Sequence, residues 1–107
     1  MNPIPLQNPI PEMIGELIDA SGHSKSTVAA ALGIPASRLS ELLAGRLRLN
    51  AELALRLARV WPDADAAYWL NIQNEMDLRE ARTAKAAALR RLKPMKPLKP
   101  LKRVAAA

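Results

Sequence analysis

Cysteine and phenylalanine are absent from the 107-residue chain, histidine occurs once, and aromatic residues make up only 3% of it. Without cysteine the chain has no disulfide and no thiolate nucleophile, and a lone histidine, His23, is too few for an ordinary zinc site. Valine, isoleucine and threonine together supply only 11 residues, which disfavours a β-sheet. We expect no metal and no cofactor.

Long apolar runs are missing as well. No run approaches the roughly 20 residues that a membrane-spanning helix needs. The N-terminal stretch MNPIPLQNPIP is broken by proline and has neither the charged start nor the apolar centre of a signal peptide. These absences predict a cytoplasmic protein that does not contact a membrane.

Alanine and leucine are abundant, with 20 and 17 residues. Both residue types favour helices. Because half of the residues are apolar, a chain of this length can build one modest core and not two. The composition therefore predicts a single domain of short, packed helices.

The net charge of +6 is distributed unevenly along the chain. Residues 1–81 carry seven Lys or Arg and all ten Asp and Glu, a balance of −3, whereas the last 26 residues carry nine cations and no acid. Prolines cluster in the first eleven residues and again at 94–100. We therefore expect a proline-rich arm (1–10), a folded domain (11–82) and a basic Lys-Pro-rich tail (83–107).

Proline and glycine divide the body into five helices, at about 11–21, 24–33, 36–44, 50–61 and from about 65 to at least 82. Ser24 and Asn50 are predicted N-caps, and Asp63 and Asp65 are alternative caps for the last helix. Helical spacing predicts the core residues Ile14, Leu17, Ile18, Val28, Ala29, Leu32, Leu39, Leu42, Leu43, Leu53, Ala54, Leu57, Ala58, Trp61, Trp69, Ile72 and Met76. Helices this short form only by docking on one another, so the pattern predicts a compact five-helix bundle.

Residues 24–45, SKSTVAAALGIPASRLSELLAG, have the spacing of a helix-turn-helix. Ala29 occupies the position of closest helix approach, and Gly33 occupies a turn position that needs positive φ. The remaining positions of the second helix are small or polar and are expected to face a DNA groove: Ala36, Ser37, Arg38, Ser40 and Glu41. Arg46 and Arg48 follow directly and are expected to contact phosphate.

The fifth helix has an apolar flank opposite its core face. Leu70, Leu78 and Ala81 lie on this flank at 100° per residue. An apolar flank left over after docking indicates a second subunit, so we expect a homodimer.

Three stretches resemble the HigA-type helix-turn-helix antitoxins, within the phage-repressor-like class: SKSTVAAALGIPASRLSELLAGR, NAELALRLARVW and AAYWLNIQNEMDL, all within residues 11–82. The arginine in A-L-R-L-A, the W-L-N-x-Q run and the nearby D-L are typical of the HigA-like branch. The resemblance implies a lambda-repressor-like bundle and a dimeric repressor that binds double-stranded DNA at a palindromic operator in its own promoter. It also implies neutralisation of a partner toxin, an mRNA-cleaving ribonuclease. Lys25 and Arg46 would hold phosphates, and Ala36, Ser37, Arg38 and Glu41 would face base edges.

Other functions remain open at this point. The chain could be a phage-type transcriptional repressor without a toxin, or a helical protein-interaction module that does not bind DNA. No nucleophile-elbow serine, paired-carboxylate motif or phosphate loop indicates an enzyme, and His23 has the sequence neighbours of a solvated turn residue. The tail, with its Lys-Pro-x period, is either a solubilising extension or an arm that adds DNA affinity without sequence preference. Of the aromatic residues, Trp69 is expected in the core and Tyr68 on the surface.

Overall fold

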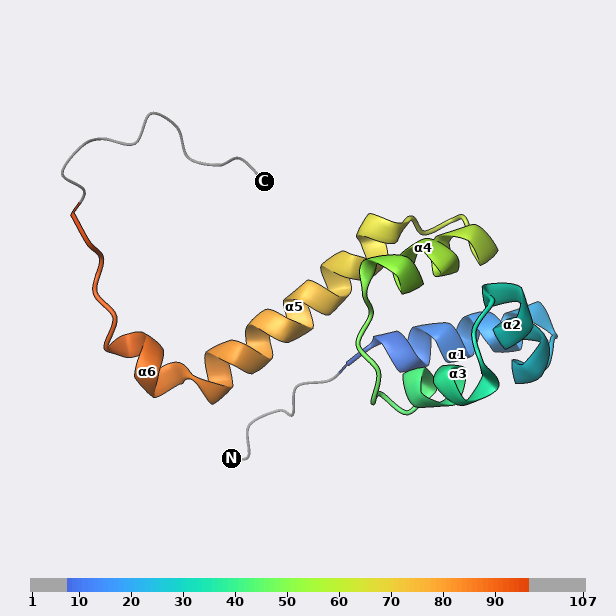
Figure 1. Ribbon diagram of the computed structural model, residues 1–107, viewed down its shortest axis with the longest axis horizontal. Coiled ribbons are helices and arrows are strands. Elements are labelled where there is room, and N and C mark those ends of the chain that lie inside the picture. Colours follow the sequence, from blue (N-terminus) through green and yellow to red (C-terminus); the bar gives the residue numbers. More distant parts are fainter. Residues whose placement is uncertain (1–7, 97–107) are drawn as a thin grey trace.

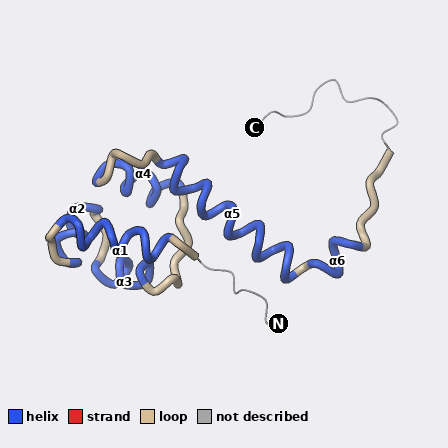
Figure 2. Tube along the Cα trace, turned by 180° about the vertical axis from the view of Figure 1, so that it is seen from behind, coloured by secondary structure: helices blue, strands red, loops and turns tan. Residues whose placement is uncertain are grey.

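The computed structural model describes residues 8–96, and within this range helices joined by loops are the regular structure, without a strand (Figures 1 and 2). The helices in the described range are α1 (Ile10–Ser21), α2 (Lys25–Leu32), α3 (Ala36–Leu43), α4 (Ala51–Val60), α5 (Ala66–Ala84) and α6 (Ala86–Arg90). Most of the predicted arm and the tail beyond residue 96 lie outside the described residues. None of the helices in residues 8–96 is long and apolar enough to cross a membrane.

The predicted N-caps are confirmed. The Ser24 hydroxyl accepts a hydrogen bond from the Thr27 N–H at 3.1 Å, and the Asn50 side chain accepts one from the Leu53 N–H at 2.8 Å. Asp65, rather than Asp63, caps α5 by accepting from the Tyr68 N–H at 2.8 Å. These caps satisfy N–H groups that a helix cannot bond internally.

The core lies between α1, α2, α3, α4 and the first half of α5. Helix α1 packs on α3, α2 contacts α3 and α4, and α4 packs along α5. The predicted positions Leu42 and Leu57 are completely buried, and Trp69 is 1% exposed. Other predicted core residues are partly buried at its edge: Leu17, Leu43, Ala58, Trp61, Ile72 and Met76.

The helical part of the chain is longer than the sequence pattern indicated. Helix α5 runs to Ala84, and α6 lies inside the segment assigned to the basic tail. The end of α5 and α6 project away from the bundle (Figure 1), and all side chains from Leu78 to Lys85 are exposed. The alanines at 81, 84 and 86–88 favour the helical conformation in this stretch, which has no buried side chain. At the other end, α1 starts at Ile10, whose N–H donates to the Asn8 side chain at 3.1 Å.

Candidate nucleic-acid interface

Helices α2 and α3 form a hairpin around a tight turn. Gly33 ends α2 at φ 71°, and its N–H and that of Ile34 each donate to an α2 carbonyl at 3.0 Å. Only glycine adopts this left-handed conformation without strain. Ala29 is 2% exposed, as expected for a position where two helices approach closely. The structure therefore contains the predicted helix-turn-helix.

Helix α3 buries one face and exposes the other. Leu39 and Leu42 attach it to the core, at 1% and 0% exposure. The side chains expected to face a DNA groove are all exposed: Ala36, Ser37, Arg38, Ser40 and Glu41. Exposure on one face of one helix is what base readout needs, and the contacts themselves stay a prediction.

Lys25 and Arg46 lie at opposite ends of this hairpin. Lys25 is the first residue of α2, and Arg46 follows α3 directly, with its N–H bonded to the Glu41 carbonyl at 2.9 Å. Both side chains are exposed. Their positions are compatible with the predicted phosphate contacts.

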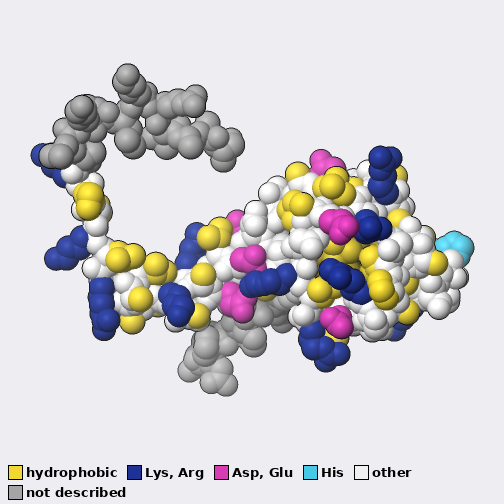
Figure 3. All heavy atoms as spheres, viewed as in Figure 1, with side chains coloured by type: hydrophobic (Ala, Val, Ile, Leu, Met, Phe, Trp, Pro, Cys, Tyr) yellow, Lys and Arg dark blue, Asp and Glu magenta, His cyan; other side chains and the backbone are white. Residues whose placement is uncertain are grey.

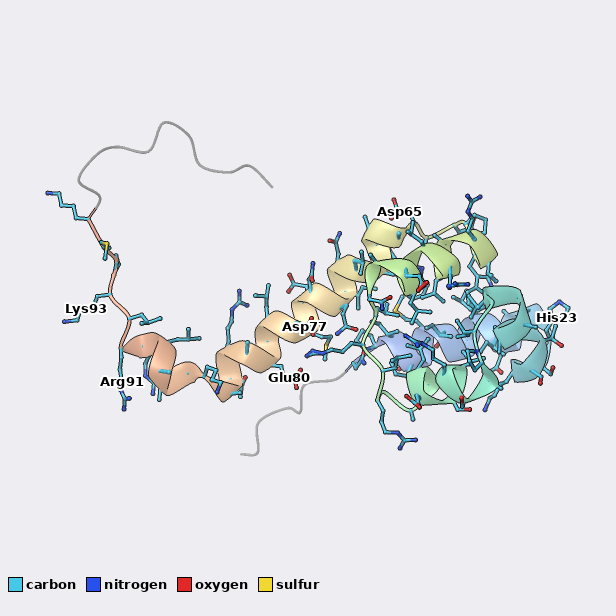
Figure 4. All side chains as sticks on the ribbon, in the orientation of Figure 1. His23, Asp65, Asp77, Glu80, Arg91 and Lys93 are labelled. Carbon is cyan, nitrogen blue, oxygen red and sulfur yellow. The ribbon has the colours of Figure 1, made fainter. Side chains whose placement is uncertain are left out.

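Arg48 is held by α5. Its guanidinium pairs with Asp77 at 2.9 Å and with Glu80 at 3.2 Å, two carboxylates one turn apart on α5 (Figure 4). The predicted role of Arg48 as a phosphate ligand stays a prediction. With two carboxylates beside it, Arg48 attracts phosphate less strongly than a lone arginine does.

Gln73 has a role in the site that the sequence did not reveal. It is 6% exposed, its Oε1 accepts from the Leu49 N–H at 3.0 Å, and its Nε2 donates to Asp77 at 2.9 Å. A hydrogen-bonded chain thus runs from the loop backbone through Gln73 and Asp77 to Arg48. It fixes the loop between α3 and α4, which carries Arg46, against α5.

Arg56 braces the turn of the hairpin from α4. Its Nη1 donates to the carbonyls of Leu32 and Gly33 at 3.0 and 3.4 Å, and its Nη2 pairs with Glu52 at 3.4 Å. These carbonyls at the end of α2 have no partner within their own helix. A Cβ at Gly33 would lie 2.6 Å from this Nη1 and would displace the end of the flexible Arg56 side chain, whereas the positive φ is what makes the turn need glycine.

The bracing residues coincide with the motif residues quoted above. Arg56 is the arginine of A-L-R-L-A, Gln73 ends W-L-N-x-Q, and Asp77 is the acid of D-L. These residues face the hairpin or the loop after it. Their structural role is to hold α3 and the cations that follow it in one orientation.

Charge is distributed unevenly over the face in Figure 3. Acidic and basic side chains lie together on the bundle and along α5, whereas Lys and Arg side chains lie without acidic neighbours over α6 and the chain after it. His23, the only histidine, lies in the turn between α1 and α2 at the far end of the bundle (Figure 4), in an exposed position. Its exposure agrees with a solvated turn residue.

An exposed second helix on a braced hairpin defines a helix-turn-helix protein of the phage-repressor type. No family model matches the chain. It is 34% identical over 80 residues to virulence-associated protein I of Dichelobacter nodosus, covering 75% of this chain and 73% of that protein. Its structure is similar to an addiction module antidote protein of the HigA family from Coxiella burnetii, with a TM-score of 0.71, 28% identity and coverage of 89% of this chain and 100% of that one.

A second solved structure is a Pseudomonas aeruginosa protein in complex with 18 base pairs of its operator DNA. Its TM-score is 0.71 and its identity 26%, over 89% of this chain and 97% of that one. The chain belongs to the family of virulence-associated protein I and is a HigA-type helix-turn-helix antitoxin. The resemblance drawn from the three sequence stretches is confirmed.

Proposed function

We propose that the protein is a cytoplasmic, non-enzymatic repressor of its own promoter and the antitoxin of a HigBA-type pair. The observation that carries this proposal is the exposed face of α3, with Arg38 in its first turn, on a hairpin held by Arg56 and Gln73. A recognition helix needs this combination of an accessible face and a fixed orientation.

The helix N-termini of the hairpin also suit a polyanion. The first turns of α2 and α3 contain no acidic residue, whereas those of α1 and α4 carry Glu12 and Glu52. An acid in the first turn neutralises the positive end of a helix dipole. The two hairpin helices therefore keep unneutralised positive ends, which favour phosphate.

We expect Arg38→Ala and Arg46→Ala to affect DNA binding differently. Arg38→Ala removes a base contact, so it is expected to weaken operator binding by about 1–3 kcal/mol and to leave random DNA binding nearly unchanged. Arg46→Ala removes a phosphate contact and is expected to weaken binding to operator and random DNA by the same factor. Fluorescence anisotropy with both DNAs measures the difference. Equal losses of affinity for both DNAs in Arg38→Ala would show that Arg38 does not contact base edges in the groove.

The homodimer is proposed through the flank of α5. Leu78 is 46% exposed and Ala81 is exposed, whereas Leu70 is partly buried against the core. Leu78 and Ala81 are therefore the main candidates for contact with a second copy, with Leu70 at the edge. Two hairpins held in this way would bind half-sites about one DNA turn, ~34 Å, apart and require a palindrome.

We expect Leu78→Asp to shift sedimentation from dimer to monomer, with at least about tenfold weaker association, because a charge would be buried in an apolar contact. The matched control is Leu55→Asp on α4, where the leucine is 59% exposed. The control should leave the dimer intact. A dimer that persists unchanged in Leu78→Asp rules out this interface.

The proposed second partner is an mRNA-cleaving toxin. Such a toxin must bind RNA and is therefore expected to be basic, which fits the acidic body of this chain better than its basic tail. Co-purification with the product of the neighbouring gene tests this partner separately from DNA binding. A repressor without a toxin would bind the operator and retain nothing from that gene.

A further inference from the structure

A groove of about 880 Å³ lies between α1 and the start of α5. Its apolar lining includes Met13 and Leu17 from α1 and Tyr68 and Trp69 from α5. Among the described residues that line it, none belongs to α2 or α3. The groove is therefore separate from the nucleic-acid interface.

Two aromatic side chains line this groove. The Tyr68 and Trp69 rings meet edge to face, with centroids 5.9 Å apart and planes at 81°, and Tyr68 is 48% exposed. Extended, proline-rich segments have exposed carbonyls and dock in aromatic-lined grooves.

The rim of the groove is acidic. Glu16, Asp63 and Asp65 line it, and within residues 8–96 none of these three carboxylates forms an ion pair. The ion pairs in that range join Arg48 to Asp77 and Glu80, and Arg56 to Glu52. Carboxylates without an ion-pair partner around an apolar floor, including Asp65, which also caps α5, fit a cationic segment that carries apolar side chains.

The chain contains such a segment. Residues 93–103, KPMKPLKPLKR, hold five cations, no acid, three prolines and three large apolar residues. A polyproline II helix has three residues per turn, so this period places Lys, Pro and Met or Leu on separate stripes. The part of the segment that the structure describes, residues 93–96, is exposed, with Met95 at 90%.

We propose that the Lys-Pro segment of one copy, residues 93–103, docks in the acidic aromatic groove of a second copy. The lysines pair with the carboxylates of the rim, and the Met and Leu stripe lies on the apolar floor beside the exposed Tyr68 ring. Lysines that pair with the rim cannot contact DNA phosphates at the same time. The segment is therefore docked in the groove when the protein is free of DNA and leaves the groove when it binds DNA.

The geometry of α5 favours docking in the groove of a second copy over docking in the groove of the same chain. Tyr68 and Ala84 are 16 residues apart on one helix, a rise of about 24 Å, and the chain after α6 runs away from the bundle (Figure 1). To return to the groove of its own chain, the tail would have to span this distance. At about 3.1 Å per residue, that would use roughly eight tail residues before any contact with the groove. In a second copy the whole repeat is available for contact.

The test uses the lack of cysteine, because Val104→Cys, directly after the Lys-Pro segment, provides one site for a nitroxide spin label without changing a side chain proposed to contact the groove. Spin-labelled chain is mixed with a cysteine-free chain that carries ¹³C-methyl methionine, and the Met13 methyl signal is recorded. We expect this signal to lose most of its intensity at 0.1 M salt. It should recover at 1 M salt, where the Debye length falls from about 10 to 3 Å.

A matched pair of triple variants separates the groove from general charge. Glu16→Gln/Asp63→Asn/Asp65→Asn removes the acidic rim. It is expected to weaken the association between the groove and the Lys-Pro segment of a second copy about tenfold. The amide that replaces the Asp65 carboxylate still accepts an N-cap hydrogen bond, so α5 keeps its start. Glu12→Gln/Asp19→Asn/Glu75→Gln changes the net charge equally outside the groove and should leave association unchanged.

Two results overturn the proposal. The first is equal weakening of association in both triple variants. The second is a Met13 signal that loses intensity only when label and isotope share one chain, or not at all.

Discussion

Leu42→Ala is expected to lower the free energy of unfolding by about 2–5 kcal/mol. Helix α3 buries only Leu39 and Leu42 and packs through them against α1 and α2, and Leu42 has 0% exposure. Truncation removes buried methyl groups and leaves a cavity at this junction. Small domains have only about 5–15 kcal/mol of stability, so this loss is a large fraction of the total and the variant should unfold, and stop binding the operator, at a lower temperature or urea concentration.

Urea denaturation followed by far-UV circular dichroism measures this loss. The matched control is Leu55→Ala on α4, because this leucine is 59% exposed. It should change the unfolding free energy by less than about 0.5 kcal/mol. Similar losses for both leucines would mean that α3 is not anchored through the buried face described above.

A chain that ends at Arg91 is expected to keep its fold and operator preference but to bind DNA more weakly, with a flatter salt dependence. The deleted segment carries Lys93, Lys96, Lys99, Lys102 and Arg103, with no acid to offset them. Each neutralised phosphate contributes about 0.9 to the slope of log affinity against log salt, so two tail contacts change it by about 1.8 per chain.

The melting temperature of the shortened chain should barely change. Residues 92–96 are exposed, and a segment without buried side chains contributes little to a core. Anisotropy titrations over a salt series and a thermal melt make the comparison. A much lower melting temperature would show that the tail contributes to the stability of the fold. An unchanged slope of log affinity against log salt would show that the tail does not contact the DNA.

Local signals in the sequence were sufficient for most of the fold. Ser24, Asn50 and Asp65 act as caps because their short side chains reach the free N–H groups of the first turn, which depends only on neighbours in the chain. Gly33 ends α2 for a similarly local reason. Helical spacing alone also located the buried face of α3 and its exposed counterpart.

The missing parts depend on contacts between distant residues or on weak local preferences. Gln73 and Leu49 are 24 residues apart, and so are Arg56 and Leu32, so neither hydrogen bond follows from spacing along one helix. Arg48 illustrates the same limit, because its partners on α5 neutralise a cation that the sequence places next to the hairpin. Helix α6 could not be located from proline and glycine, because both are absent from the alanine-rich stretch before Pro94.

The most direct measurement of DNA recognition is the affinity of the full chain for the DNA upstream of its own gene, compared with scrambled DNA of equal length at the same salt concentration. Specific binding by a recognition helix predicts at least about 10³-fold tighter binding to the upstream DNA. Equal affinity for the two DNAs would contradict an operator-binding function and would make the hairpin a surface for protein contact.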